Sequence, residues 1–346
     1  MPSVVDRWSG WILTLRPGGA GGALDTQRPG LCCTTQPHVP HYWDGTQQPD
    51  QAPRRHRAAS ATPTPPNSPD DDYILGRTSE EYQRLRWQAR LWEPTTARVL
   101  DQVGIGPGVR CLDVGCGPGE VMRLMAERVG ASGQVTGVDN DGRLGREALE
   151  ILRATVPGRF EFVHADVDAT DELPGGPFDL VYARILLTHL HDPVAMLRRL
   201  FAWTRPGGVM LIQDYDASAG GVWPPLATWE EFERVYYGVL EKAGKDPWIG
   251  WKLPLHFAAA GVGEPDGTDV AGLLRPLAEV GGMFQAVYQS LRPMGLRLGL
   301  TTEADGQAFL AEIADAARDG RGVGMSPLLV SAWKGKPPEP DTRPAP

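Results

Sequence analysis

A short glycine-rich loop is the part of this sequence where a ligand could most easily approach the backbone. The chain reads Asp113-Val-Gly115-Cys-Gly117-Pro-Gly119, and a helical pattern follows at once. Glycine allows a sharp turn and leaves space where a Cβ atom would obstruct a ligand. The first turn of the following helix offers free N–H groups that suit a carboxylate or a phosphate. The same glycines could simply permit a tight strand-to-helix turn, with Asp113 capping the loop's own N–H groups.

Two further carboxylates follow apolar segments in the same way. Asp139 ends one such segment and Asp166 follows the next. The carboxyl ends of neighbouring strands are where open α/β sheets bind ligands. There, a carboxylate at 139 can accept both hydroxyls of a ribose, and one at 166 can reach the amino group of an adenine. We interpret Asp141, Asp168 and Asp171 as loop or cap residues.

Two histidines are candidates for proton transfer. His189 and His191 lie in the segment LLTHLHDP, after the fourth apolar segment. A neutral imidazole there could take a proton from a hydroxyl group or an acidic carbon, although such a histidine more often packs and forms local hydrogen bonds. We name His189 as the candidate catalytic base. No Cys/His cluster has metal-ligand spacing, so no metal site is expected.

The segments that would position these residues alternate between strand and helix patterns. Apolar runs predict strands at 109–114, 134–138, 160–164, 178–183 and 209–213. Helical spacing of apolar residues predicts helices at 120–129, 146–154 and 193–203, with a turn at 205–208. This alternation predicts a doubly wound α/β fold, in which helices cover both faces of a mostly parallel sheet.

Five segments occur in the order that is typical of one enzyme family. CLDVGCGPGE, VTGVDND, HADV, FDLVYAR and RPGGVMLIQD resemble the successive motifs of class I S-adenosylmethionine-dependent methyltransferases. The segment 73–94 resembles the leading helical segment of bacterial small-molecule methyltransferases related to the ubiquinone/menaquinone C-methyltransferase group. The resemblance implies a Rossmann-like sheet of seven strands with an antiparallel last strand, a helical cap, and S-adenosylmethionine as cofactor with S-adenosylhomocysteine as product.

The resemblance also assigns residues to parts of the cofactor. The loop would hold the methionine moiety, the second strand end the ribose, and the third the adenine. The implied residues are, in that order, Asp113, Gly115, Gly117 and Gly119; Asp139 and Asn140; and Asp166 and Val167. Tyr73, Arg77 and Gln88 would close over the cofactor, and Arg184 could reach its carboxylate or pair with a surface acid.

The segment after residue 214 is expected to be specific for the substrate. Helices are predicted at 228–242, 252–260, 277–291 and 302–318, and strands at 267–270 and 328–333, with the last strand antiparallel beside the sixth. Aromatic and methionine side chains crowd these helices and could line an apolar pocket or pack as a lid core. They are Trp223, Trp229, Tyr236, Tyr237, Trp248, Trp251, Met283, Phe284, Tyr288 and Met294.

The two ends of the chain differ in composition from its middle. Residues 1–72 are rich in Pro, Gly, Thr and Gln, and residues 336–346 are rich in Pro. Such segments cannot bury enough apolar surface to offset the entropy of ordering, so both are predicted to be disordered tails. The methyltransferase domain is expected over 73–335, with cap insertions at about 215–250 and 272–320.

Charge and composition narrow the choice of partners. The formal net charge of −9 argues against binding to nucleic acid. No apolar run is long enough for a membrane span, and four cysteines are too few for a disulfide framework in 346 residues. We expect a cytoplasmic enzyme whose partner is a small molecule. Its oligomeric state is left open, with a homodimer as one alternative.

The predicted reaction is transfer of the cofactor's methyl group to an oxygen, nitrogen or carbon nucleophile of a small, partly apolar metabolite. Such a displacement depends on positioning and exclusion of water. One alternative is an NAD(P)-dependent oxidoreductase, which the G-x-G-x-G spacing and Asp166 disfavour. Others are a non-catalytic S-adenosylmethionine-binding regulator and an RNA or protein methyltransferase.

Overall fold

The structure is a computed structural model, and it describes residues 79–339 of the chain. The predicted cofactor contacts Tyr73 and Arg77 lie outside the described residues, as do the predicted N-terminal tail and residues 340–346. Within the described part, no helix is both long and apolar enough to cross a lipid bilayer.

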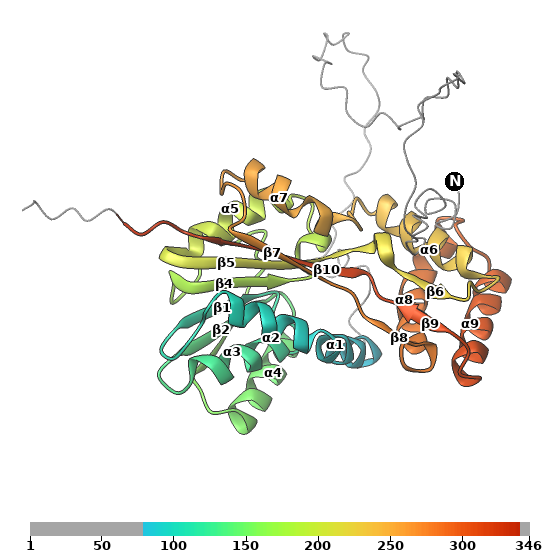
Figure 1. Ribbon diagram of the computed structural model, residues 1–346, viewed down its shortest axis with the longest axis horizontal. Helices are drawn as coiled ribbons and strands as arrows, with labels where there is room; N and C mark the ends of the chain where they lie inside the picture. Colours follow the sequence, from blue (N-terminus) through green and yellow to red (C-terminus); the bar gives the residue numbers. More distant parts are fainter. Residues whose placement is uncertain (1–78, 340–346) are drawn as a thin grey trace, which may run out of the picture. The chain divides into compact units, whose positions relative to one another are not determined.

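A seven-stranded sheet forms the centre of the described chain (Figure 1). Its spatial order is β3-β2-β1-β4-β5-β10-β7. The strands from β3 to β5 run parallel, and β10 runs antiparallel between β5 and β7. The predicted mostly parallel sheet with an antiparallel last strand is therefore confirmed. The bounds are β1 Arg110–Val114, β2 Gln134–Asp139, β3 Phe160–His164, β4 Phe178–Arg184, β5 Thr204–Asp216, β7 Gly267–Ala271 and β10 Leu328–Gly335.

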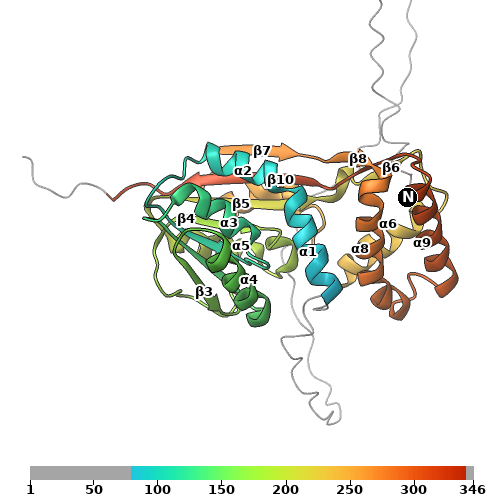
Figure 2. The ribbon, with the colours of Figure 1, turned by 90° about the horizontal axis from the view of Figure 1, so that it is seen from below.

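Helices cover both faces of this sheet, as Figures 1 and 2 show. Along β1, Cys111 belongs to the core shared with α2, α3 and α4, and Leu112 belongs to the core shared with α5 and α7. Because successive side chains point to opposite faces, both must be apolar, which explains the continuous apolar runs in the sequence. The doubly wound arrangement is confirmed. The bounds are α2 Glu93–Gln102, α3 Glu120–Val129, α4 Gly142–Thr155, α5 Pro193–Trp203 and α7 Ile249–Ala259.

Three further helices pack on one another and have a core of their own. We call α6 (Trp229–Lys242), α8 (Leu277–Arg297) and α9 (Glu303–Arg318) the helical layer. Phe232, Phe284 and Phe309 are among its buried residues. Three short strands form a second sheet, and each adjoins one of these helices in the chain order. In spatial order they are β6 Gly221–Trp223, β9 Val323–Met325 and β8 Leu274–Pro276. The sequence did not predict these strands, since three residues are too few to show an alternating pattern.

Two element boundaries differ from prediction at places that matter for the site. The predicted turn at 205–208 is wrong, because β5 already begins at Thr204 and continues to Asp216, where it still pairs with Leu328 of β10. The helix predicted at 146–154 begins at Gly142, because the Asp141 side chain caps it by accepting hydrogen bonds from the N–H groups of residues 143 and 144. The added residues at the end of β5 and the start of α4 include Tyr215 and Leu144, which line the cavity described next.

Candidate active site

A cavity of about 560 Å³ extends from the carboxyl ends of the central strands to the helical layer. It is closed on a third side by α1 (Ser79–Leu91). Most of the predicted site residues within the described chain line it: Asp113, Gly115, Gly117, Asp139, Asn140, Asp166, Val167, Arg184 and His189. Topology brings these residues together, since they follow four adjacent parallel strands. Gly119 does not line the cavity.

The glycine loop has a backbone that only glycine adopts easily. The φ angles are +71° at Gly115, +49° at Gly117 and +77° at Gly119. A Cβ atom at Gly117 would meet no protein atom within 4 Å, so this glycine faces open space. At Gly119 a Cβ atom would come within 3.1 Å of the Ala148 and Leu152 side chains of α4. Gly119 therefore serves the turn and the packing of helices, whereas Gly117 leaves space for a ligand.

The two acids beside the loop have different environments. Asp113 is 2% exposed, and its Oδ2 atom has no hydrogen-bond partner among the described residues. Burial raises the pKa of Asp113 to about 7, against the opposing charge of Arg184. Asp139 accepts hydrogen bonds from the backbone N–H of Gly117 at 2.9 Å and of Asp141 at 2.8 Å. Asp139 thus orders the loop, and Asp113 offers a buried oxygen suited to a polar ligand.

The residues predicted at the adenine lie at the end of β3. Asp166 is exposed, and its Oδ1 accepts a hydrogen bond from the N–H of Asp168 at 2.9 Å. Val167 is buried, and its carbonyl accepts from Nη1 of Arg199 at 2.7 Å. Asn140 follows β2, where its carbonyl lies 3.2 Å from Nε2 of His164. These contacts fix the backbone of two neighbouring strand ends.

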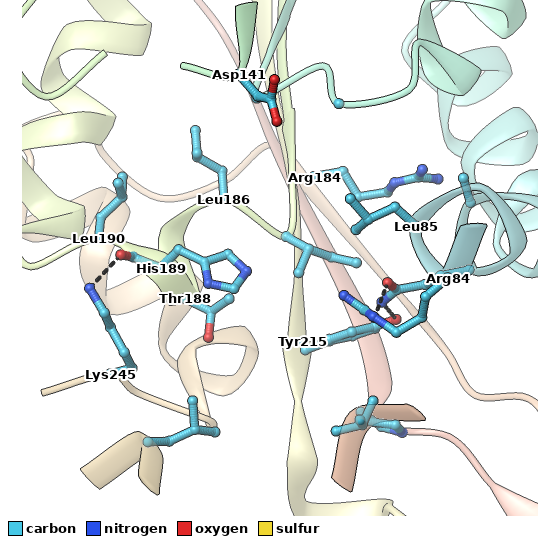
Figure 3. Close-up of a pocket in the computed structure, with 18 of the residues that line it drawn as sticks. Arg84, Leu85, Asp141, Arg184, Leu186, Thr188, His189, Leu190, Tyr215 and Lys245 are labelled. Carbon is cyan, nitrogen blue, oxygen red and sulfur yellow. Dashed lines mark hydrogen bonds between the residues drawn. The ribbon is translucent and has the colours of Figure 1, made fainter. Parts of the chain in front are cut away.

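The imidazole of His189 points into the cavity from the short turn after β4 (Figure 3). The Lys245 ammonium donates a hydrogen bond to the His189 carbonyl at 2.6 Å, which ties this turn to the segment after α6. Burial, followed by the positive charges of Lys245 and Arg84, lowers the pKa of His189 to about 4. The imidazole is therefore neutral at pH 7 and able to accept a proton.

A buried carboxylate holds the same turn in place. Asp214 of β5 accepts hydrogen bonds from the N–H of Thr188 at 3.2 Å and of Tyr215 at 2.8 Å. The turn begins at Ile185, whose φ of +53° is unfavourable for a β-branched residue. An unfavourable backbone angle persists only where its surroundings impose it, and here it lies on the cavity wall. The Asp214 hydrogen bonds and the surroundings of Ile185 therefore hold residues 185–189 in a defined position.

Sequence reasoning found only one described residue on the side of the cavity formed by α1 and β5. The resemblance pointed to Gln88, which lines the cavity, but not to Tyr82 or Tyr215. The Tyr82 hydroxyl donates to the Asp141 carboxylate, and Gln88 Nε2 donates to the Tyr215 hydroxyl at 2.5 Å. Residues 82, 85 and 89 line the cavity at the spacing of one helix face, a signal that could have found them. Lys245 is a single lysine between helices, and no pattern in the sequence marks it as a site residue.

The helical layer contributes an apolar side of the cavity, which we call the aromatic wall. Of the aromatic residues singled out in the sequence, Trp229, Tyr236 and Tyr237 line the cavity. Met283 and Phe284 line it as well, while Tyr288 is buried inside the layer. Trp223 and Trp251 are 66% and 70% exposed and take no part. The prediction of an apolar pocket therefore holds for some of these residues, and the packing interpretation holds for others.

Known proteins share this chain's sequence pattern. A family model described as a methyltransferase domain matches residues 81–249. Trans-aconitate 2-methyltransferase of Rhizobium leguminosarum bv. trifolii is 31% identical over 212 residues, which cover 55% of this chain and 78% of that protein. The same enzyme of Paracidovorax citrulli is 29% identical over 228 residues, covering 64% and 78%.

A second group of relatives matches over a shorter stretch. Phosphoethanolamine N-methyltransferase 3 of Arabidopsis thaliana is 37% identical over 124 residues, or 35% of this chain. The chain spans 24% of the length of that protein. The matched family model and the bacterial relatives, together with the sheet order and the glycine loop, confirm the resemblance seen in the sequence. The chain belongs to the class I S-adenosylmethionine-dependent methyltransferases.

Proposed function

We propose that the protein transfers a methyl group from S-adenosylmethionine to a small, partly apolar acceptor held in the same cavity. The observation that carries this is the continuity of the cavity, which joins the glycine loop at one end to the aromatic wall of the helical layer at the other. Cavities of this kind, with a mostly apolar lining and some polar groups, are typical sites for small molecules.

The cofactor end is proposed to lie across β3, β2 and β1. Asp166 and Val167 would hold the adenine, Asp139 and Asn140 the ribose, and the loop the methionine moiety. The buried, unpartnered oxygen of Asp113 fits a role toward the cofactor's ammonium group, because a buried polar atom without a partner is costly. Arg184, whose Nη1 donates to Thr96 at 3.2 Å, stands at the end of the neighbouring strand β4. These roles stay proposals.

The acceptor end is proposed to lie between the β4 and β5 ends and the helical layer. When bound, S-adenosylmethionine supplies an activated sulfonium methyl group, so the protein need not generate a strong electrophile. Its residues instead orient the acceptor and exclude water, which the aromatic wall and α1 favour. His189, neutral and directed into the cavity, would take a proton from the acceptor where the nucleophile carries one.

The names of the relatives suggest acceptors with which to begin. The bacterial relatives are named for trans-aconitate and the plant relatives for phosphoethanolamine. Each would fit the proposed reaction class, with an oxygen nucleophile in the first case and a nitrogen nucleophile in the second. Methylation of either by this chain is part of the proposal.

Calorimetric titration of the full chain with S-adenosylmethionine, S-adenosylhomocysteine and NAD tests the cofactor assignment. We expect the first two to bind with micromolar affinity and NAD not to bind. Asp139→Ala should weaken both by at least tenfold, because it removes the proposed ribose acceptor and loosens the Gly117 loop. Exposed Asp171 gives a matched control, and Asp171→Ala should bind normally.

Turnover with S-adenosylmethionine labelled in its methyl group separates an enzyme from a cofactor-binding regulator. Label should pass to an organic acceptor in a panel that includes trans-aconitate and phosphoethanolamine. Binding of NAD in place of S-adenosylmethionine would overturn the cofactor assignment. Tight cofactor binding without transfer to any small molecule across a broad metabolite panel would favour the regulator.

A further inference from the structure

The hydroxyl oxygen of Tyr215 accepts two hydrogen bonds at the cavity wall. Gln88 Nε2 donates to it at 2.5 Å and Trp92 Nε1 at 2.7 Å. An indole N–H can only donate. The amide of Gln88 is oriented as well, because its Oε1 accepts from Arg84 Nη1 at 2.9 Å. Both acceptor positions of the Tyr215 oxygen are therefore filled.

The proton of Tyr215 must consequently find an acceptor elsewhere. The hydroxyl donates no hydrogen bond to any described residue. Burial raises the pKa of Tyr215, so the hydroxyl keeps its proton at neutral pH. A buried donor without an acceptor costs free energy, and a ligand in the cavity would remove that cost.

The strand order indicates which ligand the proton meets. The proposed cofactor residues follow β3, β2 and β1, with Arg184 at the end of β4, whereas Tyr215 lies on β5. Two strand spacings separate β1 from β5, a distance of about 10 Å. Tyr215 lines the same cavity to which the helical layer contributes Trp229 and Phe284. Its hydroxyl is therefore placed for the acceptor.

Two arginines act on this donor. The hydrogen bonds run in one direction, from the Arg84 guanidinium to Gln88 and from Gln88 to Tyr215. Such a chain polarises each successive bond and strengthens the last donor. Arg184 acts on the Tyr215 hydroxyl from the β4 end, and its guanidinium forms no ion pair with any described residue. This environment favours an anionic oxygen over a neutral one.

We propose that Tyr215 determines acceptor specificity by donating its hydrogen bond to an anionic oxygen, of a carboxylate or a phosphate, on the methyl acceptor. The acceptor is then amphipathic, with its anionic group at Tyr215 and its apolar part against Trp229 and Phe284. This inference rests on the proposed function, since it assigns the same cavity to a methyl acceptor.

The test compares acceptor binding in variants that change only the Tyr215 donor. Tyr215→Phe keeps the ring and removes the hydroxyl. Gln88→Glu puts a carboxylate beside Tyr215 that accepts the hydroxyl's hydrogen bond within the protein. Tyr288→Phe is the matched control, because that hydroxyl donates to Glu231 inside the helical layer and not into the cavity.

The full chain, saturated with S-adenosylhomocysteine, is titrated with trans-aconitate and its trimethyl ester, and with phosphoethanolamine and ethanolamine. At least one anion should bind, and the uncharged or dephosphorylated analogue should bind at least tenfold more weakly. Tyr215→Phe and Gln88→Glu should each raise the Kd of that anion at least tenfold, and the double variant should be little worse than either. The Kd of S-adenosylhomocysteine should stay within twofold, and Tyr288→Phe should match the parent.

Each other outcome has a defined meaning. If neither anion binds the parent, or if Tyr215→Phe leaves the Kd of the anion unchanged, the specificity inference is overturned while the methyltransferase proposal stands. If Tyr215→Phe weakens S-adenosylhomocysteine instead, Tyr215 belongs to the cofactor. If S-adenosylhomocysteine does not bind the parent at all, the proposed function fails and the inference fails with it. Which anion binds decides between a carboxylate and a phosphate.

Discussion

At the scale of single residues, the site combines groups whose protonation is shifted by burial. His189 is the case with a direct kinetic consequence, because its lowered pKa keeps the imidazole neutral far below pH 6.5. If it accepts a proton from the acceptor, His189→Asn should reduce kcat by about 100-fold or more. The same change at exposed His191 should cost at most a few-fold.

The pH dependence of that effect distinguishes His189 from an ordinary histidine. With a pKa of about 4, the ratio of parent kcat to variant kcat should stay constant from pH 8 to pH 5. A histidine of pKa 6.5 would lose about thirtyfold over the same range. The lowered pKa also means that the unfolded chain binds the proton more readily, so this group makes the protein less stable as the pH falls from about 6.5 to 4. If the kcat of His189→Asn equals the kcat of the parent, His189 has a purely structural role.

At the scale of elements, Asp141 joins three of them. Its side chain caps α4, accepts from Tyr82 of α1, and follows directly on β2. Asp141→Ala should lower the free energy of unfolding by about 1–2 kcal/mol through the lost cap. It should also speed hydrogen exchange in α1, since Tyr82 loses its partner.

Two controls make this prediction specific, with urea unfolding and amide exchange as the measurements. Asp141→Asn keeps an oxygen for the cap and should retain most of the stability. Asp171→Ala, at a side chain that is 93% exposed, should change the free energy of unfolding by less than about 0.5 kcal/mol. Equal losses in Asp141→Ala and Asp141→Asn would argue against the cap as the cause.

The same elements show how far sequence reasoning reaches. The strands and helices around the loop were predictable because their apolar periodicity is strong and local. The roles of Tyr215 and Lys245 were not, because each depends on partners more than 50 residues away in the chain. The extension of β5 to Asp216 was hidden for the same reason, since it depends on pairing with β10. Long-range pairing leaves no periodic trace in a single sequence.

At the scale of the whole described chain, the sheet and the helical layer contribute different sides of the cavity. The proposed cofactor residues lie at strand ends, and the aromatic wall lies on α6 and α8. Each part has its own buried core. This division predicts that damage to one core should affect one ligand more than the other.

Phe309→Ala tests that division, because Phe309 of α9 is fully buried in the helical layer and does not line the cavity. Its ring packs against Trp229 and Phe232 of the aromatic wall. The loss of about 3–5 kcal/mol in the free energy of unfolding should loosen the layer and abolish methyl transfer, while the Kd of S-adenosylhomocysteine changes only a few-fold.

Calorimetric scans of the variant provide the measurement. S-adenosylhomocysteine should raise the temperature at which the sheet unfolds and leave unchanged the lower temperature at which the helical layer unfolds. The matched change in the sheet core, Phe178→Ala, should instead lower the transition that the cofactor stabilises. A single transition in Phe309→Ala, with cofactor binding lost together with transfer, would mean that sheet and layer form one cooperative unit and that the acceptor wall cannot be separated from the cofactor site.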